Sequence, residues 1–281
     1  MSSYRSERLT SIETYMFGLK ARAHLHHCLV HGTFSVELTR LAVLRKTYCR
    51  SVRPATLLPF IIKAVALAVR RTPQVNRILF RHVPWGRRIV RFDDVDVNVP
   101  ITRRIGDEMV TFIGTIRRAD TLSVAAIQDA LEHLQRGPAS DSRDLEKVRK
   151  LARAPRFVAS LFHWLMTRSP AFYIRNAGTC SISTLDGIRG DHFFSVGPTT
   201  SLFCIGGIGD EPVVRDGRIV VRRTMKTALA LDNYVVGGLD GVKLARTFQA
   251  LLESGSFVRD ELDALGIQIP QTPATQTELA Q

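Results

Sequence analysis

The stretch VVRDGRIVV, at positions 213–221, constrains the fold more than any other part of the sequence. Two runs of β-branched residues flank Asp216-Gly217, and this dipeptide favours the tight two-residue turn of a β-hairpin. Because a hairpin joins neighbouring antiparallel strands, the chain is predicted to contain an antiparallel sheet. The segments GTCSISTL, FFSVG and SLFCIGGIG, at 178–185, 193–197 and 201–209, are predicted as further short strands.

Helices and strands also alternate in the first half of the chain. The segment PATLLPFIIKAVALAVRRTPQVN, at 54–76, has apolar residues at helical spacing and Pro73 where its helix is predicted to end. An amphipathic helix is predicted over 120–136, with Asp120 or Thr121 near its N-cap. The other predicted elements are strands at 33–40, 88–92, 95–105 and 109–117, a short helix at 41–48 and a final helix at 241–253.

This order of elements lacks the regular β-α-β rhythm of a doubly wound sheet, so it predicts an α+β sandwich. The chain of 281 residues is near the size at which one hydrophobic core stops growing. We expect a single domain over 1–255 and a C-terminal extension over 256–281. The polar end of that extension, PQTPATQTELAQ, is predicted to be disordered.

Charge and cysteine content narrow the class of protein. The formal net charge of +13 favours anionic partners, among them phosphorylated cofactors and acidic carrier proteins. Nucleic acid is not predicted as a partner, because no helix-turn-helix pattern, zinc spacing or aromatic-interleaved basic stripe occurs. The four cysteines form no C-x-x-C pair, which favours a reducing compartment and hence the cytoplasm. No apolar run is long enough to predict a membrane span.

The segment from Lys147 to Asn176 combines basic residues with an aromatic and aliphatic run, interrupted at Pro155 and Pro170. A helix of this composition can lie on an anionic membrane, grip a partner or hold an acyl chain. A core or oligomer-interface helix is the preferred interpretation. Peripheral membrane contact through Lys147 to Asn176 stays open as an alternative.

The stretch LDNYVVGGLDG, at 231–241, has the composition of a catalytic loop, with an acid, a side-chain amide and a glycine pair. Among the side chains that precede Asp240, only that of Asp232 could act as a base near neutral pH. Asn233 cannot substitute, because its amide does not ionise in that range. The loop therefore has a catalytic composition without an obvious proton acceptor.

Six segments follow one another along the chain: TFSVELTRL, RRTPQVNR, VDVNVPI, TFIGTIRRADTLSVAAI, GTCSIST and SLFCIGGIGDEPVVRDGRIVVRRTMKTALALDNYVVGG. In this order they resemble the catalytic domain of the 2-oxo acid dehydrogenase acyltransferases, relatives of chloramphenicol acetyltransferase. The resemblance covers roughly Ser11 to Gly255. It implies a two-layer sandwich of the chloramphenicol acetyltransferase-like type, a mixed sheet with helices on one face. It further implies a trimer with its active site between subunits, and acyl transfer involving coenzyme A or another thiol.

The family's D-H-R-x-x-D-G motif supplies the general-base histidine, and a serine or threonine on an earlier strand donates to the oxyanion. Carried onto this chain, Asp232 matches the leading aspartate, a position often paired to an arginine, and Gly238 matches the closing glycine. Asn233 occupies the histidine position and Gly237 that of the second aspartate, while Ser183 falls where the oxyanion donor is expected. The resemblance thus implies catalytic positions at Ser183, Asn233 and Asp232 in a degenerate motif.

Other histidines were weighed as site residues. The stretch HLHHCLVHG gathers four of them, but no second cluster supplies further metal ligands, so no metal is predicted. His31 matches a histidine common before the family's first strand, and His192 follows Ser183 closely enough to reach the same channel. We expect His31, His192, Gly237 and Gly238 to contribute to substrate binding.

Three functions follow as hypotheses. The first is a protein that acts on or binds an acyl thioester, on coenzyme A or an acyl-carrier protein, with no tightly bound cofactor. The second is an inactive pseudoenzyme subunit that assembles with an active homologue, and the third is a membrane or carrier-protein binding module. No lipoyl or subunit-binding domain is recognised in the sequence, and Lys147 to Asn176 exceeds the corresponding stretch of complex-forming relatives. Both features favour a stand-alone branch, as a homotrimer or a hetero-oligomer with a homologue.

Overall fold

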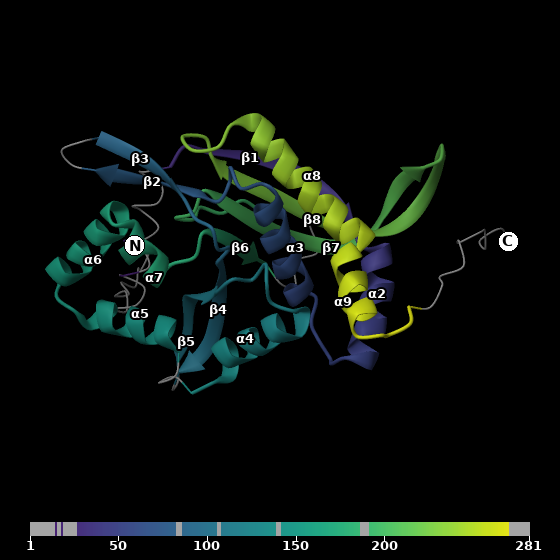
Figure 1. Ribbon diagram of the computed structural model, residues 1–281, viewed down its shortest axis with the longest axis horizontal. Helices are drawn as coiled ribbons and strands as arrows, with labels where there is room; N and C mark the ends of the chain where they lie inside the picture. Colours follow the sequence, from purple (N-terminus) through teal and green to yellow (C-terminus); the bar gives the residue numbers. More distant parts are fainter. Residues whose placement is uncertain are drawn as a thin grey trace, which may run out of the picture.

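The computed structural model describes Tyr15, Gly18 and residues 27–82, 86–105, 108–138, 142–185 and 191–269 (Figure 1). Its strands are β1 (Leu29–Glu37), β2 (Arg77–His82), β3 (Gly86–Arg91), β4 (Val97–Ile105), β5 (Glu108–Ile116), β6 (Cys180–Thr184), β7 (Ser201–Arg215) and β8 (Arg218–Asp232). Its helices are α2 (Thr39–Ser51), α3 (Leu58–Arg71), α4 (Val124–Arg136), α5 (Arg143–Arg153), α6 (Arg156–Arg168), α7 (Pro170–Asn176), α8 (Gly238–Ser254) and α9 (Ser256–Ala264).

Six strands form the main sheet, in the order β1-β8-β7-β6-β4-β5. The pairs β1 with β8, β7 with β8 and β4 with β5 are antiparallel, whereas β6 is parallel to both β4 and β7, so the sheet is mixed. The predicted hairpin is confirmed: Asp216 and Gly217 both have positive φ, at 51° and 74°, as its two-residue turn requires. Figure 1 shows its tip reaching beyond the sheet.

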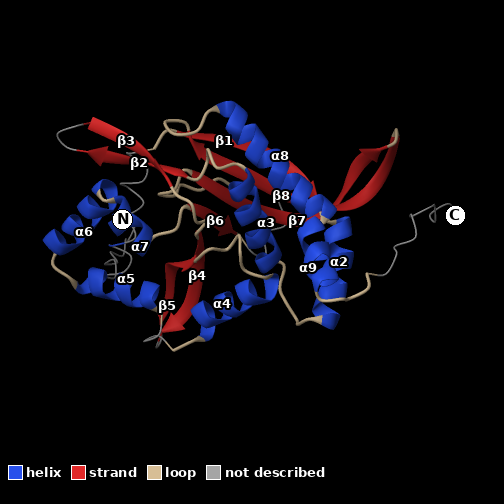
Figure 2. Cartoon of the chain, viewed as in Figure 1, coloured by secondary structure: helices blue, strands red, loops and turns tan. Residues whose placement is uncertain are grey.

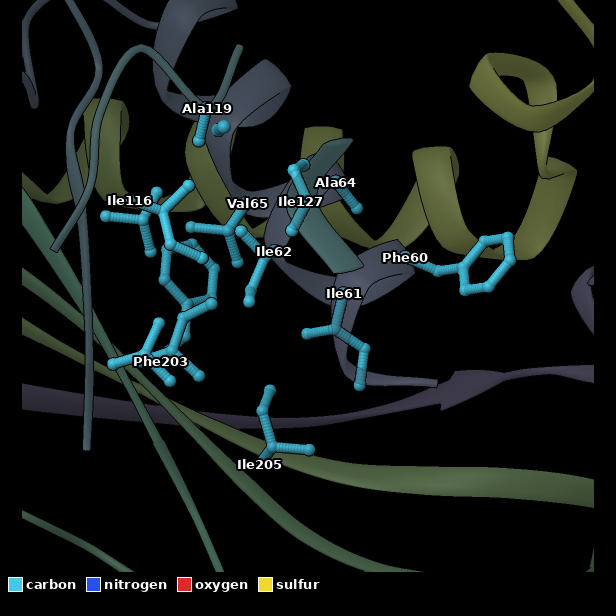
Figure 3. Packing of buried hydrophobic residues seen from close by; sticks show 14 of the residues in the cluster. Phe60, Ile61, Ile62, Ala64, Val65, Ile116, Ala119, Ile127, Phe203 and Ile205 are labelled. Carbon is cyan, nitrogen blue, oxygen red and sulfur yellow. The ribbon is translucent and has the colours of Figure 1, made fainter. Parts of the chain in front are cut away.

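The hydrophobic core lies between this sheet and a layer of helices centred on α3. Phe60, Ile62 and Val65 of α3 are fully buried, and Figure 3 shows α3 side chains among residues of the sheet and of α4. Helices α4 and α8 flank α3 in the same layer (Figure 2). The predicted α+β sandwich with a mixed sheet is therefore confirmed.

Local sequence explains where these helices begin and end. α3 starts with Pro59 in its first turn and stops at Arg71, two residues before Pro73, as predicted. α4 begins later than predicted, because the Ser123 hydroxyl accepts a hydrogen bond from the Ala126 amide and acts as its N-cap. The prediction of Asp120 or Thr121 as the cap was wrong.

One more helix follows the predicted final one. α9 packs Phe257, Val258 and Leu262 into the same core as the rest of the sandwich. Its Glu261 accepts hydrogen bonds from the Tyr48 hydroxyl, at 2.8 Å, and from the Val124 amide at the start of α4. The domain limit at residue 255 stays a prediction, and the predicted tail at 270–281 lies outside the described residues.

Two strand predictions needed correction. β2 was not predicted, although it pairs with β3 in a separate two-stranded sheet. FFSVG was predicted as a strand but forms an extended loop, in which Phe193 packs on a small cluster that includes Leu202 and Ala228. Phe193 is thus held by side-chain packing without ladder hydrogen bonds, whereas Phe194 and Val196 are exposed.

Helices α5, α6 and α7 lie apart from the α3 layer, beside β2 and the β4–β5 edge (Figure 2). The chain breaks between them as predicted, with Pro155 as the N-cap of α6 and Pro170 in the first turn of α7. Phe157, Leu161 and Trp164 form one exposed stripe on α6, so this stripe is not part of the core of the single chain. Among the described helices, none has the length and apolar character needed to cross a bilayer.

Candidate functional site

A cavity of about 420 Å³ lies between the α6–α7 segment, the β2–β3 hairpin and the β4–β5 face of the main sheet. Its apolar wall includes Ile78, Ile113, Phe162, Met166 and Tyr173. A volume of a few hundred cubic ångströms, with apolar walls and a few polar groups, is typical of small-molecule sites.

A hydrogen-bonded polar cluster forms one part of the cavity lining. Asn98, only 3% exposed, accepts from the Thr115 hydroxyl at 3.0 Å and from the Gly178 amide at 2.8 Å. Its Nδ2 donates to the Ser181 hydroxyl, which also accepts from Thr199 at 2.8 Å. Because these partners satisfy one another, the cluster is a rigid part of the fold next to the cavity.

His27 lines another part of the cavity and is joined to Asp232 at the end of β8. The His27 Nδ1 lies 2.7 Å from Asp232 Oδ2, and the two side chains are 14% and 1% exposed. Tyr234 and Arg87 line the cavity nearby, with the Arg87 guanidinium 5.9 Å from the centre of the Tyr234 ring.

Asp232 is held by donors on both carboxylate oxygens. Its Oδ1 accepts from the backbone amides of Tyr234 and Cys28, at 3.1 and 3.2 Å. Burial alone would raise the pKa of the carboxyl, but the hydrogen bond with His27 and the backbone donors together lower it below its ordinary value. Asp232 is therefore a carboxylate at neutral pH.

The rest of the predicted loop is more open. Asn233 is exposed, and its backbone amide donates to the Cys28 carbonyl at 2.7 Å. Gly237 is the N-cap of α8 and Gly238 its first residue. A Cβ at either glycine would meet no atom within 4 Å, and the φ of Gly237 is −74°, so neither position requires glycine.

Ser183 lies on β6, away from this loop. It is level with Cys204 on β7 and Ala228 on β8, which stands four residues before Asp232. With about 3.3 Å per residue and about 4.8 Å between strands, Ser183 and Asp232 are roughly 16 Å apart. The structure thus does not bring Ser183 and Asn233 together within one chain.

The two histidines predicted for substrate binding also lie elsewhere. His31 is exposed on β1, with the edge of its ring against Phe194 at a centroid distance of 5.1 Å. His192 lies 3.3 Å from the Phe34 carbonyl, also on β1, three strands from the strand of Ser183. His24 and His26 fall outside the described residues, and in the described part no three metal-ligating side chains gather.

Neither buried cysteine has the character of a nucleophile. Burial raises the pKa of the Cys204 thiol to about 11, with partial opposition from a backbone hydrogen bond of Ser195. Burial also raises the pKa of Cys180 far above its ordinary value, and the nearby Asp96 acts in the same direction. Both thiols stay protonated at neutral pH.

The fold is an α+β domain with a substrate-sized cavity beside its mixed sheet, and comparison with known proteins identifies its family. The family model "2-oxoacid dehydrogenases acyltransferase (catalytic domain)" matches residues 3–148 and 175–258. The chain belongs to this family. The match omits residues 149–174, which cover the end of α5, all of α6 and most of α7.

Curated relatives are distant in sequence. The lipoamide acyltransferase component of the branched-chain alpha-keto acid dehydrogenase complex of Pseudomonas aeruginosa is 26% identical over 199 residues, covering 70% of this chain and 39% of the relative. The dihydrolipoyllysine-residue acetyltransferase component of the pyruvate dehydrogenase complex of Staphylococcus aureus is 23% identical over 251 residues, covering 84% and 49%. The chain spans less than half the length of either relative.

Solved structures share the fold. The cubic core of a pyruvate dehydrogenase multienzyme complex superposes with a TM-score of 0.66 at 18% identity, covering 92% of this chain and 94% of the other. The dihydrolipoamide acetyltransferase of Azotobacter vinelandii gives 0.65, with the same identity and coverage. At this identity the likeness establishes the fold alone.

Sequence reasoning missed His27 as a partner of the site. It was grouped with its neighbouring histidines as a possible metal ligand, although its partner Asp232 lies 205 residues away. The sequence held one signal. The leading aspartate of the family motif is often paired to an arginine, and no partner had been assigned to Asp232 in this chain.

Proposed function

We propose that this protein acts on or binds an acyl thioester, carried by coenzyme A or an acyl-carrier protein, with the acyl group in the cavity beside α6 and α7. The observation that carries the proposal is the cavity itself. It joins an apolar wall suited to an acyl chain to polar groups at His27 and Asn98, within a fold of the acyltransferase family.

In this proposal Ser183 donates to the carbonyl oxygen of the thioester, and Asn233 supplies a second hydrogen bond. Since Ser183 lies roughly 16 Å by strand spacing from Asp232, which adjoins Asn233, the two would meet only where two copies or two homologues pack together. A homotrimer or a hetero-oligomer with a homologue would provide such a junction. Coenzyme A is the expected co-substrate, with the positive net charge of the chain favouring its phosphates.

The test is turnover with defined donors. The purified full chain is offered acyl-coenzyme A donors of increasing chain length, with thiol and amine acceptors, while release of free coenzyme A is followed. We expect release that depends on both donor and acceptor and that Ser183→Ala lowers by about 10²–10³, the usual loss for an oxyanion donor. Thr47→Ala changes a partly exposed residue of α2 whose hydroxyl bonds the backbone of its own helix, so it serves as the control and should leave the rate unchanged.

An absence of turnover with every donor would contradict the enzymatic form of this proposal. The double change Asn233→His with Gly237→Asp restores the family motif, and the open space at Gly237 admits the new side chain. If this variant also fails to turn over, while the parent chain co-purifies with a homologue carrying an intact motif, the pseudoenzyme function replaces the enzymatic one.

A second candidate function is docking of α6 on an anionic membrane surface. The exposed stripe Phe157, Leu161 and Trp164 favours it, because large apolar side chains at i, i+4 and i+7 can enter the interface together. The exposed Arg153 and Arg175 on the adjoining helices add positive charge beside the stripe. The stripe lies in the segment that the family match omits.

A further inference from the structure

The His27–Asp232 pair has the geometry of a general base with its orienting carboxylate. Asp232 is anionic and lies against Nδ1 of His27, so Nδ1 carries a proton, and in the neutral form of the ring Nε2 carries the lone pair. The ring lines the cavity, and no described residue is recorded as bonded to Nε2. A neutral imidazole with an available Nε2 at a substrate-sized cavity is equipped to accept a proton.

The pairing of Asp232 with His27 differs from the aspartate–arginine pairing that the family resemblance implies. The resemblance implies an aspartate often paired to an arginine, which is a permanent cation and cannot exchange a proton. In this chain a histidine occupies the pairing role, while Asn233 has replaced the family's histidine. Compared with the family motif, the loop therefore lacks an imidazole at position 233, and Asp232 instead bonds the imidazole of His27.

We propose that His27 is the general base of this site, and that Asp232 is a positioning residue that fixes its tautomer. This inference rests on the proposed function. His27 Nε2 takes the proton from the acceptor thiol or amine as that group attacks the thioester carbonyl. The tetrahedral intermediate then expels the thiolate of the donor, which takes the same proton back from His27. The acceptor gains the acyl group, and the donor leaves as a free thiol.

The charged and titratable groups around His27 come from several elements. Asp232 bonds it directly, and the remaining groups on the cavity are Tyr15, Arg87, Lys147, His163, Arg168, Tyr173 and Tyr234. Lys147 is occupied by Asp144 and by the Asn176 carbonyl, and Tyr173 donates to the Gly178 carbonyl. Burial raises the pKa of Tyr173, so that group stays neutral. Among these groups, His27 carries the ionised carboxylate of Asp232 on its ring, at 2.7 Å.

Kinetics of three full-length variants provide the first test. His27→Asn removes the base, and we expect kcat to fall by about 10²–10⁴ with KM little changed. Asp232→Asn can keep the backbone contacts while its amide donates to Nδ1, which moves the proton to Nε2; we expect kcat to fall again and the acidic limb of the pH–rate profile to shift. His133→Asn, an exposed change on α4, should match the parent chain.

A second measurement does not depend on turnover. Two-bond ¹⁵N–¹H correlation spectra of histidine-labelled protein should show the His27 ring with Nδ1 protonated at neutral pH, and with Nε2 protonated in Asp232→Asn. If His27→Asn folds poorly, His27→Ala with added imidazole replaces it, and rescue of turnover would support the inference. Turnover that survives loss of His27, or a ring protonated on Nε2 in the parent chain, would overturn it. Absence of turnover in every chain, the parent included, would overturn the enzymatic form of the proposed function as well.

Discussion

At the residue scale, Asp232 bonds three separate parts of the candidate site: the His27 ring, the turn at Tyr234 and the backbone just before β1. Its carboxylate fixes the His27 ring, caps the turn at Tyr234 and receives the Cys28 amide at the start of β1. From the family motif, the sequence predicted Asp232 and Gly238 as the first and last positions of this loop. It could not predict the pairing with His27, because a hydrogen bond across 205 residues depends on the β1–β8 ladder that brings the two together.

Asp232 also predicts an acid sensitivity of the fold. Its pKa is lowered in the folded state, so its stabilising contribution is complete above the unfolded pKa of about 3.9 and disappears as the pH falls through the lower folded pKa. We expect Asp232→Asn to reduce the free energy of unfolding by about 1–3 kcal/mol at pH 7 and by much less near pH 3.

Urea unfolding of both proteins between pH 3 and pH 7 measures this difference. Asp263→Asn replaces an exposed carboxylate on α9 and is the matched control, with a curve expected to follow the parent. An equal loss for Asp232→Asn at both ends of the range would contradict an ionised, hydrogen-bonded Asp232.

At the element scale, regular hydrophobic spacing was the signal that predicted structure well. α3, the β7–β8 hairpin and the breaks at Pro155 and Pro170 were all found, because periodicity and turn chemistry are local properties. The prediction of FFSVG as a strand was wrong and β2 was not predicted, because sheet pairing is not a local property. Whether an apolar stretch pairs in a sheet or packs as a loop depends on its neighbours in the folded chain, such as Ala228 on β8 in the cluster that Phe193 contacts.

The stripe on α6 leads to a prediction for this element. We expect the full chain to sediment with vesicles containing anionic lipid and not with neutral vesicles. The triple change Phe157→Ser, Leu161→Ser and Trp164→Ser should weaken binding at least about tenfold, because each inserted side chain contributes on the order of 1–2 kcal/mol.

Ile219→Ser is the matched control, because Ile219 is 78% exposed on the β7–β8 hairpin, remote from α6. Equal sedimentation with both vesicle types would reject docking on an anionic surface. Self-association of the parent chain that the triple change abolishes would instead assign the stripe to contacts between copies.

At the scale of the whole molecule, the parts of the proposed site are divided across the sheet. The cavity with His27 lies by the end of β8, and Ser183 lies on β6 roughly 16 Å from Asp232 by strand spacing. The sequence predicted the sandwich from the order of its elements. The resemblance implied an active site between subunits, but the motif alone does not state which copy of the chain supplies each residue.

This separation predicts complementation between damaged chains. Ser183→Ala and His27→Asn should each lack turnover, but co-expression in equal amounts should recover about a quarter of the parent activity if each site forms between two neighbours of a symmetric oligomer. Mixing Ser183→Ala with a chain that carries both changes should recover none, because no intact Ser183 is then present. Recovery no greater than in this control would mean that the two residues do not share an intersubunit site.

The pairing of β1 with β8 has a consequence for how the chain is made. β1 is an edge strand whose recorded ladder partner is β8, and that partner begins nearly two hundred residues later. During translation Leu29–Glu37 therefore leaves the ribosome long before the strand that will cover it exists. An uncovered strand is a template for pairing with other chains, so we expect Leu29–Glu37 to be open to such pairing until residue 232 has been added.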